Sequence, residues 1–481
     1  MRSLTVFLGD LFVLAPYGIL TAGALLLLLG GARRRSEGSS AAVVVAMISA
    51  VGASGTLILL TWMGGGENPF LTADRTGFGF SIALLALLIL LIPVLPIRPR
   101  RFRTQPGTVL SLLLLSTSGG LLMIQADHLL AFFVGLELLS IPLYILSGLG
   151  SDSKKGTEAA FKYFLLGAIA SAFFVYGMAL LWGSLGTLRI SEISRAVSSG
   201  TAGSPGLAVF ASVLLWIGVA FKVGFAPFQM WLPDVYEGAP ATLVSWMAGG
   251  VKAAALVVAL RLLGTTPIFH TPSWSLVLSA IAVLSMVWGS FGALYQRDAK
   301  RMLGYSAIAH AGYVMLALIC AAEGSYSEAA ISLAFYVLTY GVAGLAVFLV
   351  LSLEEEDGRT GVADLAGLAL RRPALAFVLA VALFSLAGLP PLGGFIGKFN
   401  VFVLAARHGH YALLLTAVAT SVISLGYYLR LVVAAYMEKP ASATVLSVGW
   451  ATGATLTVAV LLTFFLGVMP GPVLSFLLGG P

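Results

Sequence analysis

Long apolar runs with few polar interruptions recur from one end of the 481-residue chain to the other. A run of roughly 18 residues or more, folded as a helix, crosses a hydrocarbon core of about 30 Å. In lipid the backbone must satisfy its own hydrogen bonds, so such runs form helices or a closed barrel. Barrel strands alternate apolar and polar residues over about 10 positions, and these runs do not alternate. The pattern therefore predicts an all-α integral membrane protein.

About fourteen transmembrane helices are predicted in one polytopic membrane domain that covers residues 1–481. The expected spans are 11–31, 41–63, 77–96, 107–125, 128–149, 158–183, 206–230, 240–263, 273–295, 300–321, 327–353, 374–404, 411–436 and 450–478. Most connections are short. The longest are 184–205, which has room for a surface helix, and 354–373.

Composition agrees with this class and excludes several soluble functions. The chain is 59% hydrophobic and 10% charged, against about 25% charged residues in a soluble domain. Its single cysteine, Cys320, is expected to be a core residue and cannot supply the several thiolates of an iron–sulfur cluster. No nucleotide-binding glycine motif and no cluster with metal-ligand spacing occurs. We therefore expect no cofactor and no metal on this chain.

The distribution of lysine and arginine predicts the orientation of the chain, because cytoplasmic loops collect these residues. The net charge of +7 thus needs no nucleic-acid partner. With the N-terminus outside, seventeen basic residues fall at cytoplasmic loops and span ends: Arg33, Arg34, Arg35, Arg98, Arg100, Arg101, Arg103, Lys154, Lys155, Arg297, Lys300, Arg301, Arg359, Arg371, Arg372, Arg430 and Lys439. Six fall on the other side: Arg2, Arg75, Arg189, Arg195, Arg261 and Arg407. This split predicts that both termini lie on the periplasmic or outer side of a bacterial-type inner membrane.

Four lysines fall within apolar segments instead: Lys162, Lys222, Lys252 and Lys398. A charge at the bilayer centre costs about 2.5 kcal/mol or more, so it usually marks a path for ions or protons. The alternative is a lysine that extends to the interface or a structural ion pair. This alternative is favoured for Lys162, which lies near the start of its span.

Among the acidic residues, Glu137 is the one expected well inside a span. The acidic run of Glu354, Glu355, Glu356 and Asp357 is interpreted as a solvated cytoplasmic loop. Burial disfavours the charged form of an amine, and a nearby carboxylate favours it. A lysine whose carboxylate partner comes and goes can therefore take up and release a proton, and Glu137 with Lys222 is the natural pair.

His310 lies in the middle of its span, and an imidazole that titrates near neutral pH suits a proton relay. A structural, hydrogen-bonded histidine is the alternative. Tyr305 nearby is a secondary proton-transfer candidate, as is Lys162, although packing is the more ordinary role of a tyrosine there.

Two of the lysines lie beside helix breakers. Lys222 is followed by Gly224 and Pro227, and Lys398 follows Pro390 and Pro391. Proline removes a backbone donor and obstructs the preceding turn. Broken helices in corresponding positions of two halves point to a transporter's central site. The spacing predicts two five-span repeats of opposite orientation, 107–263 and 273–436.

Several segments resemble the antiporter-like membrane subunits of respiratory complex I, the proton-translocating NADH:quinone oxidoreductase. The segments are GLELLSIPLYILSG (135–148), EAAFKYFLLGAIASAFFVYGMALL (158–181), PFQMWLPDVYEGAP (227–240), RDAKRMLGYSAIAHAGYVML (297–316) and GLPPLGGFIGKF (388–399). The DVYEGAP portion is similar to the N-type subunit. Gln229 departs from the pattern, because the family often has histidine there.

The resemblance implies a fourteen-helix fold with two inverted five-helix repeats and discontinuous helices 7 and 12. It implies that Glu137 and Lys222 load protons, that Lys252 and His310 pass them on, and that Lys398 releases them. Quinone, NADH, FMN and iron–sulfur clusters would belong to other subunits, and this chain would carry out no redox chemistry. The implied partners are the lipid bilayer and the neighbouring antiporter-like and small membrane subunits.

Three other functions remain open at this point. A subunit of a multisubunit Na⁺/H⁺ antiporter would share the fold and many of the motifs. A subunit of a membrane-bound hydrogenase would share the same membrane arm. A structural scaffold without a working proton path would keep its function when Lys222 is replaced.

Overall fold

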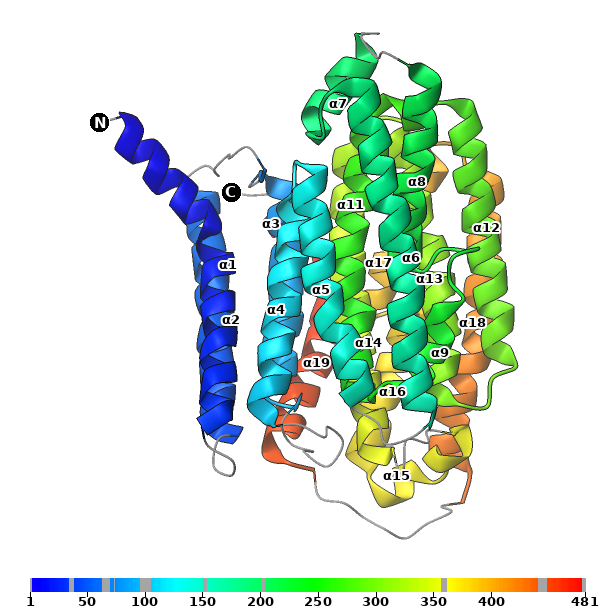
Figure 1. The fold of residues 1–481 in the computed structure, drawn as a ribbon. Helices are drawn as coiled ribbons and strands as arrows, with labels where there is room; N and C mark the ends of the chain where they lie inside the picture. Colours follow the sequence, from blue (N-terminus) through cyan, green and yellow to red (C-terminus); the bar gives the residue numbers. More distant parts are fainter. Residues whose placement is uncertain are drawn as a thin grey trace.

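The computed structural model describes residues 2–33, 39–62, 70–72, 74–95, 105–149, 154–199, 204–355, 361–439 and 448–477. In these ranges the chain is helical, and β-structure is limited to isolated bridges such as Leu71–Ala126 and His128–Arg189. The helices stand side by side in one bundle (Figure 1). We refer to its two ends as the α7 end, at the top of Figure 1, and the α15 end, at the bottom.

The long helices follow one another up and down through this bundle. They are α1 (Arg2–Arg33), α2 (Ser39–Trp62), α3 (Arg75–Leu91), α4 (Pro106–Gln125), α5 (Leu129–Leu149), α6 (Lys154–Leu185), α8 (Pro205–Val223), α11 (Lys252–Thr265), α12 (Pro272–Leu294), α13 (Ala299–Ala322), α14 (Tyr326–Glu354), α16 (Pro373–Ala387), α17 (Gly393–Arg407), α18 (Tyr411–Met437) and α19 (Trp450–Val468). The short ones are α7 (Ile190–Ser198), α9 (Trp231–Gly238), α10 (Ala241–Trp246), α15 (Leu368–Arg371) and α20 (Pro470–Leu477). A π-helix, η3 (Met247–Val251), joins α10 to α11.

In the described part, twelve helices are long and apolar enough to cross a membrane, with α10, η3 and α11 counted as one. Each of the other two predicted spans, 77–96 and 374–404, contains a shorter apolar helix, α3 or α16. The all-α membrane class is therefore confirmed, while the total of fourteen crossings stays a prediction. The expected surface helix in 184–205 is α7.

Two predicted spans are not continuous helices, as the breakers required. Span 206–230 holds α8 and the break after it, which ends where α9 begins, and span 374–404 is α16 followed by a break and then α17. Span 450–478 was expected to be one helix but is α19 and α20, because Pro470 begins a new helix where α19 ends.

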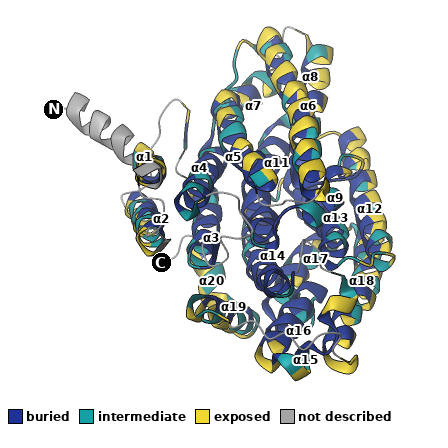
Figure 2. Cartoon of the chain, turned by 60° about the horizontal axis from the view of Figure 1, so that its bottom comes forward, coloured by how far each residue is buried: buried dark blue, intermediate teal, exposed yellow. Residues whose placement is uncertain are grey.

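Burial is graded across the bundle. In the most apolar 18-residue stretch of each helix, every residue is buried within Ala241–Thr265, and 89% are buried in α13 and in α14, whereas 33% are buried in α6 and in α18. Figure 2 shows this layering, with α11 and α14 dark inside and α6, α8, α12 and α18 exposed outside. The helices with the deepest burial are therefore those that carry Lys252 and His310.

Glycines allow two helix pairs to approach closely. A Cβ on Gly119 of α4 would lie 2.3 Å from the backbone nitrogen of Leu139 in α5. A Cβ on Gly289 of α12 would lie 2.4 Å from that of Ala309 in α13. Small residues at helix contacts are the usual means of close packing in membranes, where apolar burial alone does not drive association. These contacts fix the rotation of α5 and α13, and thereby the directions of Glu137 and His310.

Candidate functional site

The two helix breaks share one backbone geometry. Gly224 and Gly388 end α8 and α16, each with a left-handed φ of 87° that suits glycine because it has no Cβ. The next residue then donates its N–H back to the helix, from Phe225 to Ala220 O and from Leu389 to Phe384 O. This arrangement is a common helix C-cap. It ends both helices inside the bundle rather than at its surface.

Lys222 lies in the last turn of α8, directly before the first break. Its Nζ donates to Ser140 Oγ at 2.7 Å and to Tyr163 Oη at 3.4 Å. The same ammonium lies 5.1 Å from the ring centroid of Tyr163 and 5.5 Å from that of Tyr144, which are favourable cation–π distances. Lys222 is 3% exposed. Its neighbours are therefore neutral hydroxyls and aromatic faces rather than a carboxylate.

Glu137 lies one helical turn before Ser140 on α5. It is partly buried and accepts a hydrogen bond of 2.5 Å from Ser171 Oγ of α6. No ion pair or hydrogen bond between Glu137 and Lys222 occurs in the described part of the chain. The two side chains have different hydroxyl partners, since Lys222 contacts Ser140 and Glu137 contacts Ser171.

Lys252 begins α11, directly after the π-helix η3. A π-turn inside an α-helix is rare and is frequently found at functional sites. Lys252 Nζ donates to Ala307 O of α13 at 2.7 Å and lies 5.2 Å from the ring centroid of Tyr340. Because Ala307 is one turn before His310, this bond brings α11 against the part of α13 that carries the histidine.

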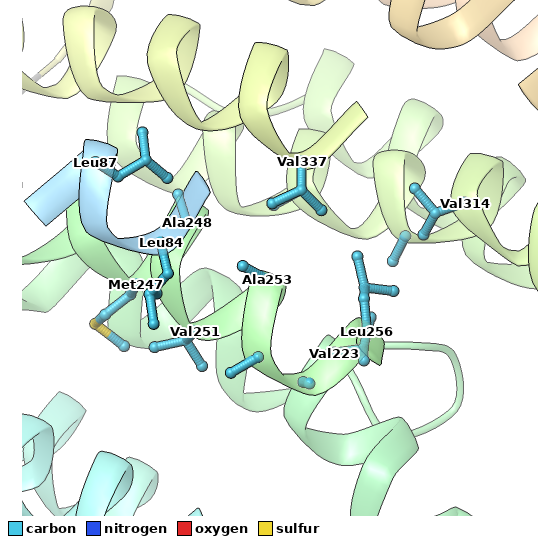
Figure 3. Close-up of a cluster of buried hydrophobic side chains, with 14 of the residues drawn as sticks. Leu84, Leu87, Val223, Met247, Ala248, Val251, Ala253, Leu256, Val314 and Val337 are labelled. Carbon is cyan, nitrogen blue, oxygen red and sulfur yellow. The ribbon is translucent and has the colours of Figure 1, made fainter. Parts of the chain in front are cut away.

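A cavity of about 20 Å³ lies between Lys252 and His310. Its remaining wall includes Val223, which directly follows Lys222, and the apolar side chains Leu256 and Val314. Figure 3 shows these three side chains in the surrounding apolar cluster. A site of this size has room for about one water molecule, but apolar atoms form its accessible wall, so it separates the amine from the imidazole and supplies no polar partner for a water.

His310 has a tyrosine on each ring nitrogen. Nδ1 lies 2.7 Å from Tyr336 Oη, and Nε2 lies 3.1 Å from Tyr428 Oη. Tyr428 also shares a hydrogen bond with Ser306. The rings of Tyr340 and Tyr313 pack on the imidazole with centroids 4.8 Å and 5.5 Å away. These hydroxyls both donate and accept, so the histidine is held in a network that can transfer protons.

Lys398 lies in the second turn of α17, after the second break. Its Nζ donates to Ala387 O at 2.9 Å and to Ser421 Oγ at 2.9 Å, and it lies 5.1 Å from the Tyr313 ring. Ala387 is the last residue of α16, so the break supplies the carbonyl that holds the ammonium. Tyr313 thereby contacts both His310 and Lys398.

These contacts place the five predicted residues in a row across the bundle. The order is Glu137, Lys222, Lys252, His310 and Lys398, and five different helices supply them. Serine and tyrosine hydroxyls, aromatic rings and the small cavity fill the intervals between neighbours.

The two secondary candidates lie apart from this row. Lys162 is 38% exposed in its side chain and pairs with Glu158 and Asp234 at 2.6 Å each. Tyr305 is partly buried, and its ring lies 2.4 Å from where a Cβ on Gly292 would be. Both contacts have a structural character, so a proton-transfer role for either residue stays a prediction.

Sequence reasoning missed a buried ion pair near the α15 end. Lys300 Nζ donates to Glu355 Oε1 at 2.7 Å and to Ala239 O at 3.0 Å, and the lysine side chain is 1% exposed. The side chain of Glu354 is only 7% exposed and pairs with Arg371 and Arg372. The interpretation of this acidic run as a solvated loop is therefore wrong for Glu354 and Glu355.

The cause of this error is that the run lies at the boundary of a span. Hydropathy placed the four acidic residues after the end of the predicted span, but α14 extends to Glu354. The segment between α9 and α10 also lies there, since Ala239 O accepts a hydrogen bond from Lys300. Lys300 and Arg261 were likewise counted with loops and span ends and are buried. Other residues of the acidic run and the orientation count lie outside the described residues: Arg34, Arg35, Arg98, Arg100, Arg101, Arg103, Glu356, Asp357 and Arg359.

A second ionic cluster clamps α9 to its neighbours. Arg301 contacts Asp234 at 2.6 Å and Glu237 at 2.8 Å, and Lys155 contacts Glu237 at 2.5 Å. Burial opposes ionisation of both carboxyl groups, but the hydrogen bonds from Lys162, Lys155 and Arg301 outweigh it and hold the pKa of Asp234 and of Glu237 below its ordinary value. Because each pKa is lowered in the folded chain, the clamp contributes its full stability above the ordinary carboxyl pKa of roughly 4, and this contribution is lost as the pH falls further, through the lowered pKa of the folded chain.

Replacing Arg301 by glutamine is expected to loosen α9, because both carboxylates lose their guanidinium partner. The partial exposure of these side chains limits the loss of stability to about 1–3 kcal/mol. The measurement is the thermal unfolding midpoint of the detergent-solubilised protein at pH 7. Lys154→Gln, at an exposed position in the same region, is the control. An equal midpoint for Arg301→Gln and the control would exclude the clamp.

In the described residues no group of three histidine, cysteine or acidic side chains is placed to hold a metal ion. Cys320 is buried, as expected for a core residue.

Comparison with known proteins supports the resemblance to antiporter-like membrane subunits that the sequence motifs indicate. Residues 126–424 match the family described as "NADH:quinone oxidoreductase/Mrp antiporter, TM". NADH-quinone oxidoreductase subunit N of Trichlorobacter lovleyi is 42% identical over 334 residues, which are 69% of this chain and 68% of that protein. A chain of respiratory complex I from Thermus thermophilus with bound aureothin is 36% identical, with a TM-score of 0.83 over 97% of this chain and 100% of that one.

A chain of the Mrp complex from Dietzia sp. DQ12-45-1b has the same fold, with a TM-score of 0.83 at 19% identity over 98% of this chain and 96% of that one. At this identity the likeness concerns the fold alone. The much higher identity to subunit N distinguishes the two branches. The chain thus belongs to the antiporter-like membrane-subunit family of NADH:quinone oxidoreductase and, within it, to the subunit N family.

Proposed function

We propose that this chain translocates protons as a membrane-arm subunit of NADH:quinone oxidoreductase, driven by quinone reduction elsewhere in the complex. The observation that carries the proposal is a set of three buried lysines and one histidine, of which Lys222 directly precedes the first helix break and Lys398 follows the second. Lys222, Lys252 and Lys398 are 3%, 7% and 5% exposed. Buried amines without a bound carboxylate are costly, and a structural purpose would be served by apolar residues of similar size.

Protons enter from the α15 end and leave at the α7 end in this proposal. Glu137 with Ser171 loads Lys222 through Ser140, since this hydroxyl contacts the ammonium. Lys252 and His310 both line the small cavity and exchange the proton only when a water molecule enters it. Lys398 then receives it by way of the tyrosine network around His310 and releases it along α17, which runs to the α7 end. The α7 end is the outer side, and both termini lie on that side.

The finer architecture we propose is two inverted five-helix repeats, 107–263 and 273–436, within fourteen transmembrane helices. Two local correspondences support it. The two breaks repeat the same hydrogen bonds around Gly224 and Gly388. The close glycine contact between α4 and α5 also has a counterpart between α12 and α13.

In this proposal the chain carries no redox group of its own, so NADH, FMN, iron–sulfur clusters and quinone are bound by other subunits. Neighbouring antiporter-like and small membrane subunits are the expected partners in a bacterial-type inner membrane. A tag on this chain, mild extraction and mass spectrometry test this assignment. Flavin and iron–sulfur subunits among the co-purified proteins support it, whereas small antiporter subunits without redox partners, or hydrogenase subunits, contradict it.

Tyr336→Phe tests the relay at His310. The substitution removes the hydroxyl on Nδ1 and keeps the ring, and one hydrogen bond is worth about 0.5–1.5 kcal/mol, so proton translocation should slow by about two- to tenfold. The measurement is the initial rate of proton uptake into proteoliposomes that contain the complex.

Tyr340→Phe is the matched control for this substitution. It removes the hydroxyl of a tyrosine whose ring packs on the same imidazole but which donates no hydrogen bond to it. Equal rates for Tyr336→Phe and Tyr340→Phe would show that the hydroxyl on Nδ1 does not carry protons.

A further inference from the structure

A polar cavity of about 450 Å³ opens at the α7 end, away from the proton path. Its volume lies in the range of small-ligand sites. Its lining comes from separate segments that meet there: Thr72, Asp74, Asp127, Arg189, Ser191, Arg195 and Arg261. Three arginines therefore face one space, which is unusual at the edge of a chain with 10% charged residues.

Two of these arginines are paired with the two aspartates. Arg261 contacts Asp74 Oδ1 at 2.8 Å, and Arg189 Nε contacts Asp127 Oδ2 at 2.8 Å. Arg261 is 7% exposed, and its Nε has no hydrogen-bond partner in the described part. The carboxylates of the cavity are thus neutralised by fixed cations, and the charge that remains on its wall is that of Arg195.

Arg195 lies on the surface helix α7 and is available for a ligand. Its Nε donates to the carbonyl oxygen of Ser191 at 3.3 Å, and its two terminal nitrogens have no partner among the described residues. Glu192 of the same helix does not line the cavity, and it accepts a hydrogen bond from Thr187 instead. A guanidinium with two unused donors matches two oxygens of a phosphate group.

We propose that this cavity is a binding site for a phosphate group, either the headgroup of an anionic membrane lipid or free inorganic phosphate. The location suits the first source. Ile190 and Ile193 of α7 are buried while Ser191 and Arg195 are exposed, so α7 is amphipathic and lies along the rim of the bundle (Figure 1). Exposed apolar side chains of Phe70 and Leu130 stand beside Thr72 and Asp127, where acyl chains would lie.

Chemical protection of Arg195 tests the proposal on the intact complex. The complex is purified, stripped of lipid with detergent, and treated with phenylglyoxal, which modifies accessible guanidinium groups. The rate of modification at each arginine is read by peptide mass spectrometry. Three probes are compared: inorganic phosphate, phosphatidylglycerol micelles and phosphatidylcholine micelles. Arg407, an exposed arginine that does not line the cavity, is the internal control.

We expect at least fivefold slower modification of Arg195 with phosphatidylglycerol or inorganic phosphate, and no change with the zwitterionic phosphatidylcholine or at Arg407. Protection by phosphatidylglycerol alone identifies a lipid headgroup, and protection by inorganic phosphate as well identifies a site for the free anion. Arg195→Gln should lower the amount of phosphatidylglycerol that stays bound, whereas Arg407→Gln should not. Equal rates with and without probes would overturn the proposal, as would an Arg195 already covered by a neighbouring subunit in the stripped complex.

Discussion

Replacement of Lys222 by alanine is expected to remove most proton translocation while the chain still assembles into its complex. In the proposed path Lys222 follows Glu137 and precedes the small cavity lined by Lys252 and His310. The neighbours of its ammonium are hydroxyls and aromatic rings. No carboxylate in the described part depends on it as an ion-pair partner, so its loss leaves no buried charge uncompensated. A positioned proton-transfer group contributes about 10²–10⁴ in rate, so pumping should fall by tenfold or more.

The measurement is the number of protons translocated per electron in sealed vesicles. Lys222→Met, which keeps the apolar volume, should behave like the alanine variant, and Glu137→Ala should also lose most pumping. Lys439→Ala removes an exposed lysine and is the control. Unchanged stoichiometry in Lys222→Ala would refute the assigned path and favour a structural scaffold, and failure to assemble would favour a structural role for the lysine.

Replacement of Lys300 by methionine is expected to destabilise the chain strongly. Its partner Glu355 is 4% exposed in its side chain and would remain buried without the ammonium. Removing one member of a buried ion pair costs roughly 3–5 kcal/mol. The amount of chain in the purified complex and the thermal midpoint of that complex should both fall.

The double variant Lys300→Met with Glu355→Met separates this effect from a general loss of packing. Removing both charges should recover most of the stability, because two apolar side chains of similar size need no partner. Arg430→Met, at a partly buried arginine that contacts backbone carbonyls rather than a carboxylate, is the matched single control. A double variant as unstable as Lys300→Met would contradict the ion-pair account.

The buried lysines of this chain differ in whether a carboxylate or only neutral groups hold the ammonium. Lys300 has a carboxylate at 2.7 Å and a backbone carbonyl at 3.0 Å, which fix its charge and make it part of the structure. Lys222, Lys252 and Lys398 have only neutral partners at the shortest distances. A charge held by neutral groups can be given up at lower cost, which is the property a proton carrier requires.

Hydropathy by itself determined that this is a helical membrane protein and located its long apolar helices. The physical reason is that lipid allows no unsatisfied backbone, so a long apolar run has one outcome. The isolated charges within these runs also indicated the candidate residues Glu137, Lys222, Lys252, His310 and Lys398, since burying a charge requires a reason. The glycines and prolines beside Lys222 and Lys398 marked both helix breaks.

Only the tertiary structure decided which of these residues are neighbours. Lys222 contacts Ser140 while Glu137 contacts Ser171, and Tyr313 lies against both His310 and Lys398. Helix rotation and the close glycine contacts set these distances. The structure likewise revealed that Lys300 and Glu355 are a buried pair rather than loop charges. Hydropathy describes each helix alone, whereas the partner of a charge at a helix end depends on what other segments cover it.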